Sequence, residues 1–278
     1  MSADAPSVLS HVADGVATVT LNRPHRLNAF DDAMGRTFDA TIVALATDAD
    51  VRVIVLTGAG RGFCSGVEMA QLAANEDGRS SGAPPPDRPD PVFDPLVPAA
   101  AELRNRYVIG FAIPQPVLVA VNGACAGLGL SIAASCDVRW ASSEAFFTTA
   151  FSRRGLTAEM GLAATLPPIV GQGAAADLLL SARRVPADEA HRMGLVSAVH
   201  EPAELLPAAL EWAADVATNV SPRSVRVIKR QLLAARDQTL DAAITSAYRE
   251  AGRSLRSADF REGVRHFVER RPPRFTGN

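Results

Sequence analysis

Val117–Asp137 reads VLVAVNGACAGLGLSIAASCD, and this stretch decides how the rest of the chain folds. Its first five residues form an apolar, valine-rich run that predicts a buried strand, and the alanine-rich run from Leu128 onward predicts a buried helix. Gly127 and Gly129 frame the turn between the two runs. A helix that begins there leaves main-chain N–H groups without intrahelical partners, at the positive end of its dipole. The turn therefore has the chemistry to hold negative charge, although glycines that only allow close packing would give the same pattern.

A second stretch repeats this pattern earlier in the chain. Val53–Met69 reads VIVLTGAGRGFCSGVEM, which is again an apolar strand, a glycine-rich turn and the expected start of a helix. Two turns that each present a main-chain N–H can hold one oxygen from two sides. This is the arrangement that stabilises negative charge as it develops on a carbonyl oxygen.

Composition limits the classes of protein to which the chain can belong. The 278 residues are 47% hydrophobic and carry a net charge of −2, which suits a large core and gives no general attraction to nucleic acid or anionic membranes. We expect the three cysteines, Cys64, Cys125 and Cys136, to be reduced thiols in a cytoplasmic protein. Tyr107–Cys136 carries no charged residue, but its prolines and glycines argue against a membrane span.

The order of elements predicts an α/β fold. An opening hairpin over 8–21 precedes a helix that Asp31 or Asp32 caps, and strands alternate with helices as far as about residue 200. We expect Thr157 to cap a helix over 158–170 that Pro167 and Pro168 break early. Mainly helical segments follow, so we divide the chain into an α/β core over 1–200 and a C-terminal helical region over 201–278.

The segment from Asn75 to Pro98 differs in kind from the rest of the chain. It is polar and dense in proline, so it cannot form a packed core element. Long segments of this type are either disordered surface loops or mobile covers over a site, and the sequence leaves both interpretations open.

Five segments together resemble one family. FCSGVEM and AVNGACAGLGLSIAASCDVRWAS are similar to the two signatures of the enoyl-CoA hydratase/isomerase (crotonase) superfamily, and LNRPHRLNAF resembles its opening motif. RRVPADEAHRMGLVSAVH and FREGVRHFVERRPPRF extend the similarity toward the C-terminus. The resemblance implies a crotonase-like spiral of ββα turns with a C-terminal helical trimerisation region. It also implies homotrimers or dimers of trimers that act on acyl-CoA, with no cofactor beyond the coenzyme A of the substrate.

The resemblance also assigns the two turns a role. It places the two N–H donors of an oxyanion hole for the thioester oxygen at Cys64 and Leu128. Four neighbouring residues are expected to bind substrate in the same turns: Ser65, Gly66, Val67 and Gly127. Because the donors are main-chain groups, Cys64 is interpreted as a packing residue and not as a nucleophile.

Two positions depart from the pattern of the family's hydratases. Those enzymes add water with two glutamates, and the corresponding positions here hold Ser131 and Phe151. These residues are expected to contact substrate, but they cannot position and deprotonate water as a carboxylate pair does. This departure argues against ordinary hydratase activity.

Glu159 is the candidate base that the resemblance leaves. Some isomerases of the superfamily carry a lone acidic residue at this point, and a single carboxylate suffices for a 1,3-proton shift. Acidic residues also favour helix N-termini for electrostatic reasons alone. The leading hypothesis is an enoyl-CoA isomerase. The alternatives are an enoyl-CoA hydratase that uses Glu159 with Ser131, and a non-catalytic acyl-CoA-binding paralogue.

Arginines are the candidates for holding the phosphates of coenzyme A. Arg23, His25 and Arg26 follow the opening hairpin, and Arg270 corresponds to a basic family position near the 3′-phosphate. Arginine matches phosphate geometry, although a solvated basic surface explains the same residues. No spacing of metal ligands is present in the sequence, so no metal site is predicted.

Overall fold

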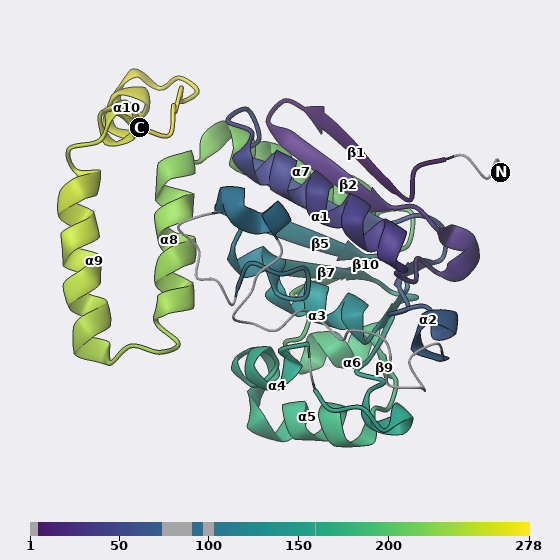
Figure 1. Cartoon of the computed structure of the whole chain (residues 1–278). Coiled ribbons are helices and arrows are strands. Elements are labelled where there is room, and N and C mark those ends of the chain that lie inside the picture. The colour runs from purple at the N-terminus through teal and green to yellow at the C-terminus, as the bar shows by residue number, and fades with distance from the viewer. Residues whose placement is uncertain (1–4, 74–90, 97–102, 159) are drawn as a thin grey trace.

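The computed structural model describes residues 5–73, 91–96, 103–158 and 160–278. Figure 1 shows a layered α/β core with three C-terminal helices beside it. The proline-rich stretch over 75–98 lies outside the described residues except for a 3-10 helix, η2 (Pro91–Leu96), so neither interpretation of it is tested. Within the described ranges, no helix combines the length and apolar character that crossing a membrane requires.

A six-stranded sheet forms the centre of the core. Its strand order is β1-β2-β3-β5-β7-β10, and only the β1–β2 hairpin is antiparallel. The strands are β1 (Val8–Ala13), β2 (Val16–Leu21), β3 (Val53–Gly58), β5 (Val117–Val121), β7 (Val138–Ser142) and β10 (Ala198–His200). All five residues of β5 are buried, as expected for an inner strand of a parallel sheet that is covered on both faces.

A smaller sheet lies beside the first, in the order β4-β6-β8-β9. Its strands are β4 (Gly62–Cys64), β6 (Ala124–Ala126), β8 (Phe146–Thr148) and β9 (Val185–Pro186). β4 and β6 run parallel, with Cys64 opposite Cys125, and the register shifts between Gly62 and Cys64. Both strands fall within segments that the sequence indicated only as turns.

The two sheets are built by a repeating ββα unit. Each unit places one strand in the large sheet, the next in the small sheet, and then a helix: β3-β4-α2, β5-β6-α3 and β7-β8-α4. The helices are α2 (Met69–Ala73), α3 (Leu128–Ser135) and α4 (Leu162–Thr165). The predicted α/β fold with a crotonase-like spiral is thereby confirmed.

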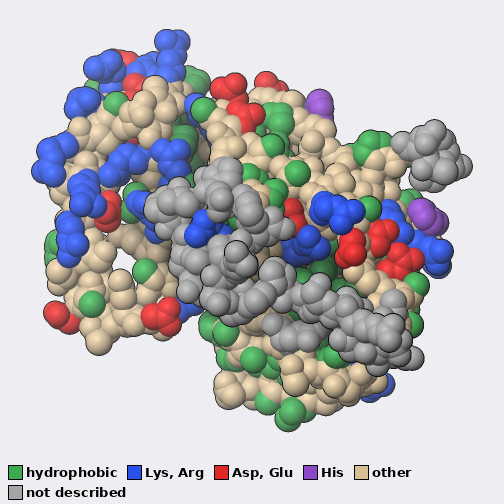
Figure 2. Space-filling model, viewed as in Figure 1, with side chains coloured by type: hydrophobic (Ala, Val, Ile, Leu, Met, Phe, Trp, Pro, Cys, Tyr) green, Lys and Arg blue, Asp and Glu red, His purple; other side chains and the backbone are tan. Residues whose placement is uncertain are grey.

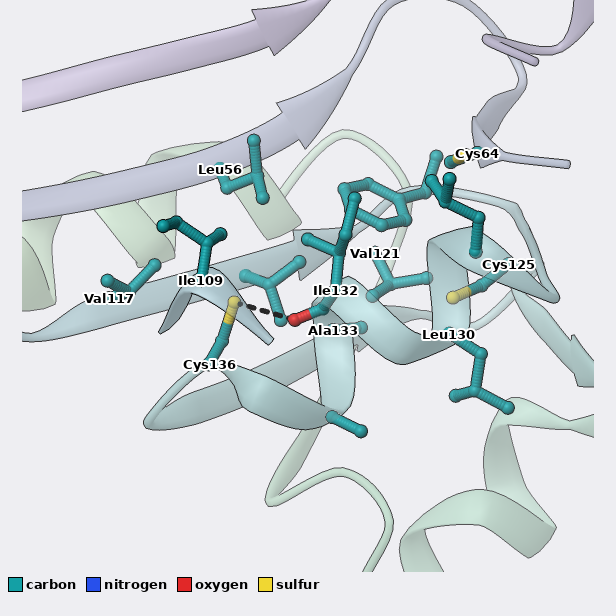
Figure 3. Packing of buried hydrophobic residues seen from close by; sticks show 14 of the residues in the cluster. Leu56, Cys64, Ile109, Val117, Val121, Cys125, Leu130, Ile132, Ala133 and Cys136 are labelled. Atoms are coloured by element: carbon teal, nitrogen blue, oxygen red, sulfur yellow. Dashed lines mark hydrogen bonds between the residues drawn. The ribbon is translucent and has the colours of Figure 1, made fainter. Parts of the chain in front are cut away.

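Helix α3 occupies the middle of the main hydrophobic core. All eight of its residues are buried, which is typical of a helix enclosed on every side. Figure 3 shows Leu130, Ile132 and Ala133 of this helix among Val121, Cys125 and Ile109 from surrounding elements. At its C-terminal end, the Cys136 thiol donates to the carbonyl oxygen of Ile132 at 3.3 Å.

The long helix α1 (Asp32–Thr47) packs on the same core, and Asp31 caps it by accepting from the N–H of Met34 at 2.8 Å. The other face of the large sheet is covered by α7 (Leu205–Asn219), whose Ala209, Ala213 and Ala217 pack against β3 and β5. Two further short elements of the core are η4 (Ile109–Phe111) and α6 (Ala187–Arg192).

The last three helices form a unit beside the core, which we call the C-terminal arm: α8 (Pro222–Ala234), α9 (Leu240–Ser254) and α10 (Ala258–Glu269). Figure 1 shows α8 and α9 as an antiparallel pair with α10 across one end. Helix α7 packs on the large sheet as part of the core, so the arm begins after it.

The helix predicted over 158–170 is wrong in its bounds. Gly161, in the left-handed region with φ +78°, is the N-cap of α4, so Thr157 caps no helix. α4 ends at Thr165, before Pro167 and Pro168 as expected, and the two prolines then stand at the first positions of a new helix, α5 (Pro167–Ser181), where a missing N–H costs little. Gly171, with φ +79°, kinks α5.

Candidate active site

The first glycine-rich turn joins β3 to β4 and continues beyond β4 to Glu68. Gly66 adopts φ +109°, a conformation that side chains rarely tolerate, and a Cβ there would lie 3.3 Å from the carbonyl oxygen of Ala126. Gly66 therefore places the first turn directly against the second turn, at the residue that precedes Gly127.

The second turn starts α3. Gly127 is the N-cap of this helix, with φ +51°, and no side chain caps it. The N–H of Ser131 donates to the carbonyl oxygen of Gly127 at 3.0 Å, but the N–H groups of Leu128, Gly129 and Leu130 donate to no other described residue. Open donors thus stand at the positive end of the α3 dipole.

The two turns touch at a second point. A Cβ on Gly129 would lie 2.7 Å from the Cβ of Cys64 and would also overlap the Cys64 carbonyl oxygen. Only glycine allows this approach without a shift of the main chain. Together with the β4–β6 pairing, these contacts bring the start of α3 and the 64–67 segment side by side.

The main-chain N–H groups of the first turn differ in availability. Those of Ser65 and Glu68 donate to the carbonyl oxygens of Leu27 and Phe30, at 3.0 Å and 2.9 Å. Cys64 has no exposed surface and lies within β4, opposite Cys125 of β6. The N–H of the half-buried Val67 donates to no other described residue. The sequence named Val67 only as a substrate contact, and nothing in its apolar side chain signals the state of its amide.

The Cys64 side chain has the environment of a packing residue. Its Sγ lies 3.9 Å from the carbonyl oxygen of Gly66. Burial raises the pKa of the Cys64 thiol to about 12, and the hydrogen bond to Gly66 offsets this only in part. A thiol with this pKa stays neutral near pH 7, whereas the thiolate is the nucleophilic form.

The positions of the two replaced glutamates lie at the second turn. Ser131 is 1% exposed on α3, and its hydroxyl donates to the carbonyl oxygen of Gly127 at 3.3 Å. Phe151 is 5% exposed, and its ring reaches within 3.9 Å of the point that a Cβ on Gly127 would occupy. Both side chains flank the start of α3, and neither carries a charge.

Glu159 lies outside the described residues, so the proposed base has no described geometry. The residues around it are described: Leu156 and Met160 are partly buried and pack against the main core. A Cβ on Gly161 would lie 3.1 Å from Cγ1 of Val108, so this part of the chain packs against the segment that leads into η4.

The predicted phosphate contacts lie in two separate places within one chain, with Arg23 and Arg26 beside Glu68 and Arg270 in the arm. Arg23 is tied into the fold by Asp31, Glu68 and the carbonyl oxygen of Ala29. The Arg26 side chain is 60% exposed and only loosely paired with Glu68, at 3.7 Å. Arg270 lies at the end of α10, in the arm, which Figure 1 places on the opposite side of the core from α2. Figure 2 shows Lys and Arg side chains gathered over this arm.

The sequence is similar to one protein family along most of its length. The family model described as enoyl-CoA hydratase/isomerase matches residues 11–86 and 100–278. The chain is 36% identical to a 1,2-epoxyphenylacetyl-CoA isomerase from Escherichia coli (strain K12), with 97% of this chain and 98% of the relative covered. It is 33% identical to an (E)-benzylidenesuccinyl-CoA hydratase from Thauera aromatica, with 97% and 99% covered.

A solved structure is also similar along its whole length. The crystal structure of an enoyl-CoA hydratase/isomerase from Mycobacterium paratuberculosis aligns with a TM-score of 0.84 at 31% identity. The alignment covers 98% of this chain and 99% of that one.

Proposed function

This chain belongs to the enoyl-CoA hydratase/isomerase family, and on that basis we propose that it is an enoyl-CoA isomerase that shifts a double bond through a thioester enolate. The observation that carries the proposal is the pair of touching turns, each with an open main-chain N–H. Donors fixed in advance stabilise the developing charge without reorganising, and loss of one such donor typically costs about 3–4 kcal/mol of barrier.

Val67 and Leu128 are the donors we propose. Leu128 was expected from the family resemblance, and its N–H is open at the start of α3. The other expected donor, Cys64, lies within the small sheet and exposes no surface, whereas Val67 is half-buried with an open N–H. We therefore propose the amide of Val67 in place of that of Cys64.

Glu159 is the base in this proposal, and it acts alone. Its carboxylate takes a proton from C2 of a 3-enoyl-CoA, and the electron pair of that C–H bond moves into a dienolate whose charge rests on the thioester oxygen. The amides of Val67 and Leu128 hold that oxygen. The carboxylic acid then returns the proton to C4, which leaves a 2-enoyl-CoA of unchanged mass and a regenerated carboxylate.

The residues at the second turn favour isomerisation over hydration. Ser131 and Phe151 occupy the positions that hold the carboxylates in the family's hydratases, and neither side chain can deprotonate water. The name of the E. coli relative, an isomerase, agrees with this choice. The names of both relatives describe acyl groups that contain an aromatic ring. Aryl-substituted acyl-CoA should therefore be among the substrates that are tested.

Two other functions compete with this one. A hydratase that uses Glu159 together with Ser131 is favoured by the name of the T. aromatica relative. A non-catalytic acyl-CoA-binding protein would keep the same turns and the same fold. In all three cases the ligand is an acyl-CoA, and the proposed isomerisation needs no cofactor beyond its coenzyme A.

The proposal extends to assembly, because the C-terminal arm leaves many apolar side chains uncovered. Ten of them are at least 43% exposed: Ile228, Leu232, Leu240, Ile244, Tyr248, Leu255, Phe260, Val264, Phe267 and Val268. Apolar surface of this extent is typical of an interface. We propose that it is covered in a homotrimer or a dimer of trimers, in which Arg26 and Arg270 contact coenzyme A phosphates.

One experiment separates the candidates. Wild type, Glu159→Gln and the control Glu144→Gln, at an exposed turn, are incubated with 3-hexenoyl-CoA and 2-hexenoyl-CoA, and the products are weighed by mass spectrometry. We expect isobaric conversion of the 3-enoyl substrate by wild type and Glu144→Gln, and a loss of about 10²-fold or more in Glu159→Gln. A gain of water identifies a hydratase. Binding without turnover or deuterium exchange at C2 identifies the non-catalytic protein. Full activity of Glu159→Gln shows that the base is another residue.

A further inference from the structure

Asn28 is fully buried in an uncommon conformation beside the first turn. It follows Leu27, and both residues lie in the left-handed region, with φ +56° and +49°. Asparagine tolerates this region better than most residues, whereas leucine does not, so the kink must be held by its contacts. The Asn28 side chain accepts from the N–H of Arg23 at 2.7 Å and donates to the carbonyl oxygens of Ala59 and Gly62 at 3.0 Å and 2.7 Å.

Asn122 also holds this turn, from another part of the chain. It lies between β5 and β6, and its Oδ1 accepts from the N–H of Gly58 at 3.1 Å. Its Nδ2 donates to the carbonyl oxygens of Gly60 and Gly62 at 2.8 Å and 3.3 Å. The carbonyl oxygen of Gly62 therefore accepts from two side-chain amides that come from different parts of the chain.

Gly62 is the point at which these contacts affect the candidate site. It is the first residue of β4, and the register of β4 against β6 shifts just after it. β4 ends at Cys64, and the Val67 turn follows at once. The two asparagines thus fix the start of a three-residue strand whose other end carries a proposed oxyanion donor.

Asn28 also lies within the segment that borders the Val67 turn. The carbonyl oxygen of Leu27 accepts from the N–H of Ser65. The main-chain N–H of Phe30 donates to the carbonyl oxygen of Gly66 at 2.8 Å, and the carbonyl oxygen of Phe30 accepts from the N–H of Glu68. The Leu27–Phe30 segment therefore runs alongside residues 65–68. It engages the amides of Ser65 and Glu68 and leaves that of Val67 open.

We propose that Asn28 and Asn122 are positioning residues for the oxyanion hole, acting through Gly62 and the Leu27–Phe30 segment on the amide of Val67. The inference rests on the proposed function, because it requires a thioester oxygen at that amide. The efficiency of such a donor depends on its placement at hydrogen-bond distance from the developing charge, and small displacements are costly. The side chains themselves touch no reacting atom.

Asn122 is the better residue to change first, because it is only half-buried. Asn122→Asp keeps the acceptor for Gly58 but turns the donor into an oxygen that faces the carbonyl oxygens of Gly60 and Gly62. Asn122→Ser removes the donor without adding charge, and serves as the second variant. Asn28→Asp makes the corresponding change at the buried residue.

Gln115 provides a matched control at the other end of the same strand. It is 8% exposed, and its side-chain amide donates to the carbonyl oxygens of Ala46 and Val51, both at 3.2 Å. Gln115→Glu therefore disturbs a buried amide that bonds two carbonyl oxygens located before β3 in the chain. The two asparagines instead bond carbonyl oxygens located after β3.

The readout is the polarisation of the thioester itself. Hexanoyl-CoA, which has no double bond to move, is labelled with ¹³C at the carbonyl and bound to each variant, and the C=O stretch is measured by difference infrared spectroscopy. We expect wild type to lower this frequency and Asn122→Asp and Asn122→Ser to lower it less. The kcat for 3-hexenoyl-CoA should fall about 10-fold or more in these variants, with KM changed less than about threefold. Gln115→Glu should keep both the frequency shift and kcat.

Three results overturn the inference, and they are distinguishable. If wild type lowers the frequency and both Asn122 variants lower it equally with unchanged kcat, the proposed function stands and the positioning role is wrong. The positioning role is also wrong if Gln115→Glu loses as much as the Asn122 variants, because the effect is then general destabilisation. If wild type itself leaves the frequency unchanged, the oxyanion hole is wrong, and the positioning role falls with it.

Discussion

The two touching turns and the C-terminal arm differ in how far they are buried within one chain. At the turns, all eight residues of α3 are buried, and glycines allow main chains to meet where a Cβ would not fit. In the arm, α10 exposes 79% of Phe267 and 73% of Val268. A cleft of about 460 Å³ also lies open between α8 and α9. The core thus completes its packing within one chain, and the arm does not.

Polar contacts tie the arm to the core. Lys229 of α8 donates to Asp137 at 2.6 Å and to the carbonyl oxygen of Gln115 at 2.8 Å. Arg52, just before β3, donates to the carbonyl oxygens of Ala217 and Phe275, which joins the core to the C-terminal tail. The difference teaches that the geometry of the turns depends on the core alone, whereas the orientation of the arm depends on a few named contacts. The predictions below can break or sharpen this comparison.

The largest effect is expected from a single N–H in the core. Leu128 is the first residue of α3, where proline is tolerated, so Leu128→Pro removes the proposed donor with little cost to the helix. We expect kcat to fall about 10²–10³-fold with little change in KM. Steady-state kinetics with 3-hexenoyl-CoA measures this, and circular dichroism confirms the fold. Leu128→Ala keeps the amide and is the control, and an equal loss in both variants would assign the effect to packing.

A smaller effect is expected where the arm meets the core. Among the described residues, Lys229→Met leaves the Asp137 carboxylate with only the N–H of Val117 as a partner, at 2.8 Å. Removing one partner of a buried pair costs about 3–5 kcal/mol, and because Asp137 is 26% exposed we expect about 2 kcal/mol here by urea unfolding. Arg192→Met breaks an exposed pair with Asp188 and should change nothing measurable. An equally stable Lys229→Met protein would contradict the role of this contact.

The same contact predicts a dependence on pH. Burial lowers the pKa of Lys229 below its ordinary value, and the attraction of Asp137 offsets this only in part. As pH rises toward the unfolded pKa of about 10.4, the unfolded chain binds more protons at this position than the folded chain does, so folding is favoured. Lys229 is the only lysine in the sequence, which makes the difference between wild type and Lys229→Met easy to assign. The stability of wild type relative to the variant should rise as pH approaches the unfolded pKa, and a fall would contradict the prediction.

The smallest effect on folding is expected on the exposed face of the arm. Phe267→Ser should change the free energy of unfolding of one chain by less than about 0.5 kcal/mol, because the side chain touches little. It should nevertheless weaken association, measured by sedimentation velocity over a range of concentrations. Leu180→Ser, at an equally exposed residue of α5, is the control. If wild type is monomeric, or if both variants assemble equally well, the proposed interface is wrong.

Local patterns predicted most of the elements. The apolar composition of the valine run and of the alanine-rich run was enough to predict that β5 and α3 are buried. Asp31 caps α1, as its position before the helix indicated. The helix expected directly after Thr157 begins instead at Leu162, where Gly161, with φ +78°, turns the chain just before it. The strands β4 and β6 were missed because three residues carry too little periodicity to be recognised.

The sequence by itself determined the α/β core and the two glycine-rich turns, because apolar periodicity and glycine placement are local properties of the chain, and the resemblance of its motifs to the family implied the spiral. Only the tertiary structure decided which N–H groups in those turns are open. Whether the amide of Cys64 or that of Val67 faces the site depends on how the Leu27–Phe30 segment pairs with residues 65–68, and no local pattern encodes a hydrogen bond between segments so far apart in the chain.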